Sequence, residues 1–417
     1  MTKTDVLLLS ELAPWPLDHG GRLRVAYLAP ALARLGLRVV VASPEALPVE
    51  APSSLRSLCV DWPASVDESD QRAFIQNWSG PLRGLRRRLA RHQGIDTARY
   101  AGALELVRRL RPRAVIGVGQ HAPVMLKGLS KDVSRVWYAA DDVVAFLLSC
   151  MGRESLDRWP SRLYGAALHT GLEVAFGGLD AIVGVSDQDQ RWLSMLGRPG
   201  VGRVIANGVD LDRFRPAAEI AVEANTAVFW GRLDFEPNVD GLIWFVDRVW
   251  SGLAKRHPGA RFRVIGRGMH RSLERLRTAE GVEWVGAVDD VRDDARSSAV
   301  TVLPMRCGGG IKNKLLEALA MGRPVVCTSR ALTGLAEDHR MPPVRLGDDA
   351  LSMASAIEQL WANPASAARL GRSARAWAER HASWDQAARA FAGLLDDCDR
   401  RAGRPSGADP RRLDRAA

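Results

Sequence analysis

The sequence predicts an α/β protein built from two domains, each with a parallel, doubly wound sheet. Its 417 residues are long for a single core. Short apolar strands alternate with segments of helical period in both halves, which is typical of parallel sheets. The alternation pauses once, from Asn207 to Pro216, and we interpret this loop as a hinge between the domains.

The N-terminal half begins with a βαβ unit, in which a strand at 5–10, a helix at 22–36 and a strand at 37–43 follow one another. Further strands are predicted at 57–60, 111–119, 134–142, 179–186 and 202–210. Polar residues and glycines follow three of these strands, which is where open α/β sheets bind ligands: Gly20 and Gly21, His121, and Asp141 with Asp142. Each has an alternative interpretation as a tight turn, a helix start or a helix cap. The absence of GxGxxG excludes a dinucleotide fingerprint.

The second half repeats the pattern and ends in helices. Strands are predicted at 226–234, 260–268, 282–290, 299–304 and 324–329, and helices at 239–258, 348–362, 364–382 and 383–400. Arg232 follows Gly231 at one strand end, and Gly266 and Gly268 flank Arg267 at another. We therefore predict domains at 1–206 and 207–385, a helix at 386–400 that returns to the first domain, and a disordered tail at 401–417.

The segment 301–329 reads as strand, glycine turn, helix and strand, with the helix at 311–321 closed by Gly322. The first turn of a helix has unpaired N–H groups and a partial positive charge, so it suits a phosphate, and Lys312 and Lys314 add two cations. Glu317 lies among Leu, Ala and Met, and a buried carboxylate needs hydrogen-bond donors. A ligand's ribose hydroxyls would supply them, or else Lys314 or Asn313 on the same helix.

Composition narrows the function classes. The five cysteines are scattered and odd in number, which argues against zinc and disulfide frameworks and favours a reducing cytoplasm. No apolar run is long enough to span a bilayer, and the opening segment is too short for a secretion signal. The net charge of +10 suits nucleic acid, anionic membrane or phosphorylated ligands. With 6% aromatic residues, stacking on nucleic acid is disfavoured.

A basic amphipathic segment lies at 82–91. Arginines alternate there with leucines at helical spacing: Arg83, Arg86, Arg87, Arg88 and Arg91 with Leu82, Leu85 and Leu89. Such a segment can lie on an anionic bilayer, or it can be a solvated face packed on the domain.

The motifs NGVD, FWGRLD, FRVIGRG, VEWVGAVDDV and GGGIKNKLLEALAMGRPVV together resemble those of the glycosyltransferases of family 4. The opening PWPLDHGGRLRVAYL and the GGGIKNK form are similar to a bacterial branch associated with exopolysaccharide and exosortase gene clusters. The resemblance implies the GT-B fold, two Rossmann-like domains facing across a cleft, with C-terminal helices crossing back. It also implies retaining transfer from a nucleotide-diphosphate sugar to a hydroxyl of a lipid-linked saccharide or polysaccharide precursor.

Applied to this chain, the resemblance implies that Glu317 binds the ribose hydroxyls and that Arg232 binds the diphosphate. The other residues that it implies are Gly309, Gly310 and Ile311 for the phosphates, Gly266 and Val288 for the donor, Gly20 and Gly21 for the donor phosphate, and His121 for the sugar or acceptor. Two positions depart from the family pattern. Gly309 stands where a second acidic residue is usual, and Asn238 stands near where a lysine is usual. We hypothesise that Lys312 or Lys314 replaces the missing cation.

No DxD occurs in the cleft segments, so we expect no metal and no cofactor. The expected location is cytoplasmic, peripheral on the inner face of the plasma membrane if the 82–91 segment binds lipid. A soluble small-molecule acceptor remains an alternative. So do a non-hydrolysing nucleotide-sugar epimerase and a non-catalytic sugar-nucleotide or nucleic-acid binding protein.

Overall fold

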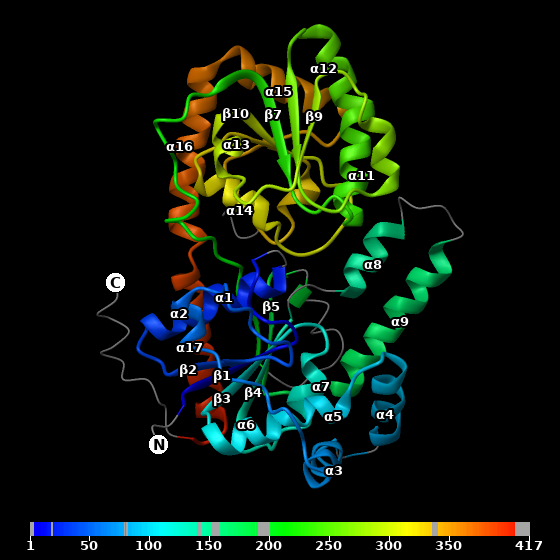
Figure 1. The fold of residues 1–417 in the computed structure, drawn as a ribbon, viewed down its shortest axis with the longest axis vertical. Coiled ribbons are helices and arrows are strands. Elements are labelled where there is room, and N and C mark those ends of the chain that lie inside the picture. The colour runs from blue at the N-terminus through cyan, green and yellow to red at the C-terminus, as the bar shows by residue number, and fades with distance from the viewer. Residues whose placement is uncertain are drawn as a thin grey trace. The chain divides into compact units, whose positions relative to one another are not determined.

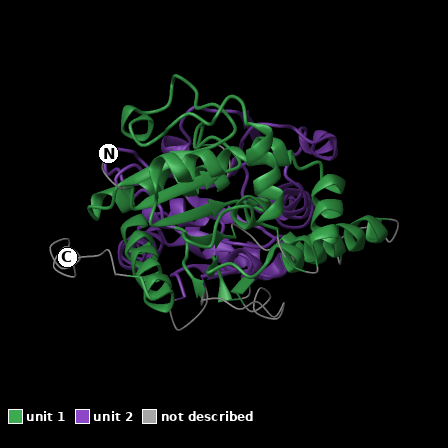
Figure 2. Cartoon of the chain, turned by 90° about the horizontal axis from the view of Figure 1, so that it is seen from below, with its two compact units in different colours: residues 1–151, 155–207, 384–417 green, residues 152–154, 208–383 purple. Residues whose placement is uncertain are grey.

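The computed structural model describes residues 4–17, 20–78, 80, 82–139, 143–151, 158–187, 189–190, 201–335 and 341–404 (Figure 1). The chain divides into two compact units, coloured separately in Figure 2. Unit 1 comprises residues 1–151, 155–207 and 384–417, and unit 2 comprises residues 152–154 and 208–383.

Unit 1 contains a six-stranded sheet in which every neighbouring pair is parallel. The strand order is β2-β1-β3-β4-β5-β6. The strands are β1 (Val6–Ser10), β2 (Val39–Ala42), β3 (Ala114–Val118), β4 (Ser134–Tyr138), β5 (Ala181–Gly184) and β6 (Val201–Val204). Strands β1, β3 and β4 are buried along their whole length, because parallel sheets are covered on both faces. The order reverses between β1 and β3, so their carboxyl ends form the switch point of this sheet.

The helices of unit 1 pack around this sheet (Figure 1). They are α1 (Gly20–Arg34), α2 (Ser53–Arg56), α3 (Glu68–Gln76), α4 (Arg83–His92), α5 (Thr97–Tyr100), α6 (Gly102–Leu110), α7 (Ala122–Lys127), α8 (Val143–Met151), α9 (Trp159–Phe176) and α17 (Trp384–Arg401). The C-terminal helix α17 packs against α1, where Tyr27 stacks on Trp384 at 5.8 Å between ring centroids. Arg113 next to β3 pairs with Asp396 and Asp399 of α17.

Two predicted elements of unit 1 differ from the structure. Gly20 and Gly21 begin α1 instead of lying in a loop. The predicted strand 57–60 is a single bridge between Val41 and Cys59. The basic amphipathic segment predicted at 82–91 is helical, and it forms α4.

Unit 2 contains a second six-stranded sheet, again parallel, in the order β12-β11-β10-β7-β8-β9. Its strands are β7 (Glu223–Trp230), β8 (Arg261–Ile265), β9 (Val282–Gly286), β10 (Ser298–Leu303), β11 (Val325–Cys327) and β12 (Arg345–Leu346). Counted in chain order from β7, this is the 3-2-1-4-5-6 order of dinucleotide-binding sheets. The order reverses between the adjacent strands β7 and β10.

Helices cover both faces of this sheet (Figure 1). They are α11 (Glu236–Phe245), which continues through a π-helical turn at Val246–Trp250 into α12 (Ser251–Arg256), then α13 (Arg292–Ser297), α14 (Asn313–Ala320), α15 (Ala350–Ala362) and α16 (Pro364–His381), with 3-10 turns at Arg271–Leu276 and Ser329–Leu332. Helix α14 is shorter than predicted at both ends, since Lys312 is its N-cap and Gly322, with φ of +66°, ends it.

All five cysteines lie in the described part of the chain, and none of them forms a disulfide bond. In the part of the chain that the structure describes, no helix combines the length and the apolar character needed to span a bilayer.

Candidate active site

The switch point of the second sheet gathers most of the predicted donor-binding residues. Strand β7 ends at Trp230 and is followed by Gly231 and Arg232, while β10 ends at Leu303 and leads into the glycines 308–310. Because β7 and β10 are neighbours in the sheet, these two segments emerge side by side at its carboxyl edge. Ligands of open α/β sheets bind in the crevice at this kind of position.

The glycines after β10 form a bend that exposes backbone N–H groups. Gly308 and Gly310 have φ of +98° and +65°, conformations that favour glycine. Within the described residues, the N–H groups of Gly309, Gly310 and Ile311 have no hydrogen-bond acceptor. Lys312 Nζ donates at 2.7 Å to the carbonyl oxygens of Gly309 and Gly310 and so holds the bend closed. The result is a concavity of N–H donors before α14, which suits an anion.

Glu317 points from α14 toward the end of β7. Its Oε2 accepts a hydrogen bond from Trp230 Nε1 at 2.8 Å. Burial raises the pKa of Glu317 above its ordinary value, and the bond from Trp230 partly opposes this shift. Neither of the two possible partners on the same helix, Lys314 and Asn313, donates a hydrogen bond to Glu317. Among the described residues Oε1 accepts no hydrogen bond, so the carboxylate keeps one oxygen for a ligand's donor.

Arg213 and Trp230 are two neighbours of Glu317 that sequence reasoning missed. The charge of Arg213 lowers the pKa of Glu317. Its guanidinium lies 5.7 Å from the ring centroid of Phe214, and its buried Nε has no acceptor among the described residues. Arg213 lies in the hinge loop and Trp230 lies at the end of a strand. These positions next to the expected site are the sequence feature that could have identified both residues.

Lys314 extends from α14 in the same direction as Glu317. Its Nζ donates to Asn238 Oδ1 at 2.7 Å and lies 4.2 Å from the ring centroid of Phe229. Burial lowers the pKa of Lys314 to about 7, with Lys312 adding to the shift and the carboxylate of Glu317 opposing it. Lys314 therefore places a half-buried ammonium at the switch point, and this ammonium loses its proton as the pH rises through about 7.

Arg232 follows β7 and is more exposed. Its Nε and Nη2 donate to Asp234 at 2.9 and 3.1 Å, and this pairing holds the pKa of Asp234 below its usual value. Its carbonyl accepts from Asn238 Nδ2 at 2.7 Å. The guanidinium is therefore preorganised by a carboxylate, at the edge where the bend and Lys314 also lie.

Gly266 and Val288 lie farther along the same edge. Gly266 follows β8, and its N–H donates to the carbonyl of Gly286 at the end of β9 at 2.8 Å. Val288, two residues beyond Gly286, is exposed. These residues lie on the β9 side of the switch point, away from the glycine bend.

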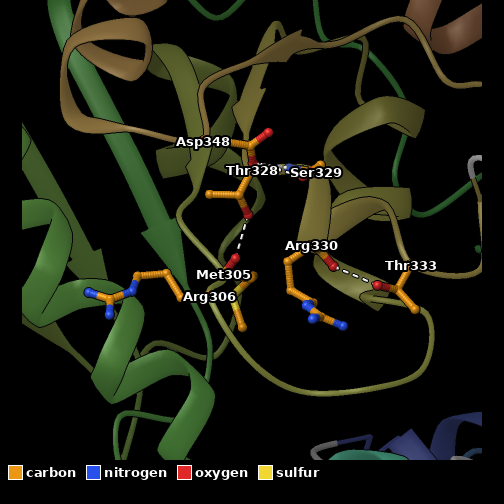
Figure 3. A pocket seen from close by; sticks show the side chains of 7 residues that line it. All are labelled: Met305, Arg306, Thr328, Ser329, Arg330, Thr333 and Asp348. Carbon is orange, nitrogen blue, oxygen red and sulfur yellow. Dashed lines mark hydrogen bonds between the residues drawn. The ribbon is translucent and has the colours of Figure 1, made fainter. Parts of the chain in front are cut away.

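On the other side of the bend, a cavity of about 360 Å³ opens where β10 and β11 end (Figure 3). Its lining is polar apart from Met305 and comprises Met305, Arg306, Thr328, Ser329, Arg330, Thr333 and Asp348. Asp348 Oδ1 accepts from the N–H and hydroxyl of Ser329 at 2.7 and 2.8 Å, which fixes the turn that carries Arg330. In Figure 3 the guanidinium of Arg330 points away from Asp348, and that of Arg306 lies on the far side of Met305.

The predicted site residues of unit 1 lie at its own switch point. His121 follows β3, and its backbone N–H and Nδ1 face Glu11, which follows β1, at 2.5 and 3.4 Å. His121 Nε2 lies 3.2 Å from Gln93 Oε1. Glu11 was missed from the sequence, although its place directly after β1 marks this edge. Gly20 and Gly21 form the first turn of α1 after the same strand. Asp141 and Asp142 lie outside the described residues.

In the described ranges, no cluster of three or more His, Cys, Asp or Glu side chains is arranged to hold a metal ion.

Comparison with known proteins agrees with this architecture. Residues 224–363 match the family model described as "Glycosyl transferases group 1". Over 342 residues the chain is 26% identical to a GDP-mannose-dependent α-(1-6)-phosphatidylinositol monomannoside mannosyltransferase of Mycobacterium tuberculosis, covering 73% of this chain and 87% of the relative.

Solved structures show the same fold. Sucrose-phosphate synthase from Thermosynechococcus elongatus superposes with a TM-score of 0.67 at 17% identity, over 94% of this chain and 98% of that one. HepE from Anabaena, solved in complex with UDP-glucose, superposes with a TM-score of 0.63 at 14% identity, over 94% and 99%.

Proposed function

Because this chain is a group 1 glycosyltransferase with the GT-B fold, we propose that it transfers a sugar, with retention, from a nucleotide-diphosphate sugar to a hydroxyl of a lipid-linked saccharide or polysaccharide precursor. The observation that carries the proposal is the switch point of unit 2. Three features lie together there: N–H groups with no acceptor among the described residues, a half-buried lysine, and a carboxylate with one oxygen that accepts no hydrogen bond from those residues.

The donor is assigned by matching its groups to this edge. The diphosphate lies against the N–H groups of Gly309, Gly310 and Ile311, and Glu317 accepts from the ribose hydroxyls. The base lies toward Val288 and Gly266, at the ends of β9 and β8. Support for a nucleotide sugar comes from the relatives, since one is named as GDP-mannose-dependent and one was solved with UDP-glucose.

The reaction follows from charge. Departure of the nucleoside diphosphate builds negative charge on the β-phosphate, and fixed N–H donors with Arg232 and a lysine stabilise that charge. The sugar passes through an oxocarbenium-like state. The acceptor hydroxyl attacks from the face that the phosphate leaves, its oxygen bonds to the anomeric carbon, and its proton passes to the departing phosphate. His121 approaches the sugar or acceptor. Because protein groups supply the charge stabilisation, we propose that transfer needs no metal or cofactor.

We place the transferred sugar at the cavity beside the bend, because Met305 and Arg306 continue directly into the glycines. Hydroxyls, Arg330 and Asp348 line it, and such groups hydrogen-bond to sugar hydroxyls. The base of the donor then lies toward β9 and β8, its phosphates lie at β7 and β10, and its sugar lies toward β11. The three parts of the donor thus follow the order of the strands in the sheet.

The function is tested by incubating the protein, with EDTA present, with a panel of radiolabelled UDP- and GDP-sugars. We expect selective retention and slow hydrolysis of one donor, because water can replace the missing acceptor. The variant Arg330→Met should bind UDP or GDP as tightly as the original chain and discriminate less between sugars.

Other results of the panel would contradict the proposal. Conversion of a sugar nucleotide to its epimer without an acceptor would show that the chain is an epimerase. Failure to retain any of the donors would contradict transferase activity. Activity that disappears with EDTA and returns with a divalent ion would exclude the metal-free mechanism.

The lipid-linked acceptor is suggested by a surface of unit 1. Helix α4 exposes Arg83, Arg87, Arg88 and Arg91, whereas Arg86 is buried and donates to the carbonyls of Ala175 and Trp78. Next to it, Tyr164 of α9 bonds to His92 at the end of α4 at 2.5 Å. The large apolar side chains exposed on α4, α8 and α9 are Leu85, Leu148, Trp159, Leu163, Tyr164 and Val174. Basic and apolar groups together suit an anionic bilayer.

Vesicle flotation tests this surface. We expect the protein to float with phosphatidylglycerol vesicles and not with pure phosphatidylcholine. Since each arginine near such a surface contributes about 1 kcal/mol, Arg87→Gln with Arg88→Gln should weaken binding about tenfold or more. The control pair Arg369→Gln with Arg372→Gln, exposed on α16, should not. Equal recovery with both lipids would reject the electrostatic contact.

A further inference from the structure

We propose that Lys314, positioned by Asn238, is the second diphosphate-binding cation of the donor site and that Lys312 is not. This inference rests on the proposed function. We call the space beside the N–H groups of Gly309, Gly310 and Ile311 the phosphate pocket. Lys314 brings a positive charge to this pocket from α14, whereas Asn238 of α11 supplies only a neutral amide.

The position of the ammonium is fixed from three sides. Asn238 Oδ1 accepts from Lys314 Nζ at 2.7 Å, and the ring of Phe229 lies beneath it. A side chain added to Gly231 would place its Cβ 2.7 Å from Nζ. The ammonium therefore rests directly against the backbone where β7 ends, which is the switch point of the sheet.

The two lysines have different tasks because their partners differ. The ammonium of Lys312 donates hydrogen bonds to the carbonyl oxygens of Gly309 and Gly310, and these bonds shape the bend. Lys314 has one acceptor, the amide oxygen of Asn238, among the described residues. An ammonium has three N–H groups, so Lys314 keeps two of them for a ligand's phosphate oxygens.

Among the described residues, no carboxylate forms a hydrogen bond with the ammonium of Lys314, although charged groups surround it. Glu317, one turn along α14, attracts the ammonium but bonds to Trp230. Lys312 repels it, and after β7 Arg232 pairs with Asp234. A bound diphosphate would therefore be the first full anion to form a hydrogen bond with Lys314.

Asn238 links the three segments of the pocket. Its side chain is almost fully buried at 4% exposure. Its Nδ2 donates to the carbonyl of Arg232 at 2.7 Å while its Oδ1 accepts from Lys314. A lysine at 238 would bring two ammonium groups together, so the neutral amide and Lys314 are complementary. Asn238 is thus a positioning residue that acts through Lys314.

A pH effect follows. Burial gives the free protein a Lys314 pKa of about 7, and a phosphate beside it raises that pKa. Binding above neutral pH then takes up a proton, so donor affinity falls as pH rises above about 7. With one proton involved, the fall is up to about tenfold per pH unit. Nucleotide sugars have esterified phosphates and contribute no titration of their own in this range.

The experiment measures dissociation constants for UDP-glucose and GDP-mannose at pH 6.5, 7.5 and 8.5 in the intact chain and its variants. Lys314→Ala should weaken binding about 10- to 100-fold at pH 6.5, since hydrogen bonds to charged groups are lost, and should abolish the pH dependence. Asn238→Lys with Lys314→Ala moves the ammonium to α11 and should restore at least tenfold of the affinity. The control Lys255→Ala removes an exposed lysine in the last turn of α12 and should change nothing.

Lys314→Ala with unchanged affinity, or with the original pH dependence, would overturn the proposal. So would a double variant no tighter than Lys314→Ala. If Lys314→Ala does not fold, Lys314→Met keeps the packing on Phe229 and gives the same comparison. If the unsubstituted protein binds none of UDP-glucose, GDP-mannose, UDP and GDP, that result would instead contradict the proposed function.

Discussion

Glu317→Gln weakens binding of UDP and GDP by about 10- to 100-fold, because a neutral amide replaces the charged acceptor of the ribose hydroxyls. The substitution keeps the size of the side chain, and its amide oxygen still accepts from Trp230 Nε1. Since burial disfavours the charge of Glu317, the variant should fold with unchanged or higher stability. The effect is therefore one of ligand recognition.

The nucleotide itself supplies a second measurement for Glu317. The original chain should bind UDP about tenfold or more tightly than 2′,3′-dideoxy-UDP, while Glu317→Gln should bind the two nearly equally. The control Glu274→Gln, which alters an exposed carboxylate 3.6 Å from Arg277, should keep the original preference. Equal losses for both nucleotides in Glu317→Gln would place the ribose elsewhere.

Gly266→Ala should destabilise unit 2 and abolish donor binding. An added Cβ would lie 1.8 Å from the carbonyl oxygen of Gly231, far inside van der Waals contact. The backbone leaving β7 must then move, and it carries Gly231 and Arg232 with it. Overpacking of this kind costs about 1–3 kcal/mol, and the displaced segment is a wall of the phosphate pocket.

Calorimetry with and without UDP or GDP tests the Gly266 prediction. We expect a fall in melting temperature of about 2–10 °C and no protection by the nucleotide. Gly259→Ala is the matched control, since Gly259 also has a positive φ, of +86°, but open space around it. It should lose about 1–2 kcal/mol through backbone strain alone and keep nucleotide protection. Full protection of Gly266→Ala would show that the two strand ends do not shape the donor site.

Much of the fold was predictable from local pattern. Buried strands such as β3 and β10 are short apolar runs, and their alternation with helices indicated two parallel sheets. Boundaries were less predictable, because they depend on single backbone conformations. The extended backbone of Lys312, for example, moves the start of α14 from the predicted residue 311 to Asn313.

The candidate site was predictable to the level of segments. Glycines, Arg232, Lys312, Lys314 and Glu317 follow strands at one sheet edge, and the structure places them there. Their partners were not predictable. Trp230 bonds to Glu317 across 87 positions, and Glu11 to His121 across 110, so no local spacing reveals either contact.

The sequence by itself determined the two parallel sheets, the glycine bend and the set of charged residues near it, because strand and helix patterns and turn chemistry are local properties. Only the tertiary structure decided which lysine reaches the end of β7. Lys312 and Lys314 are two residues apart and chemically identical, and they differ only in the groups that surround them. The order β11-β10-β7-β8 brings Asn238 and Phe229 beside α14, and this packing turns Lys314 toward the phosphate pocket while Lys312 closes the bend.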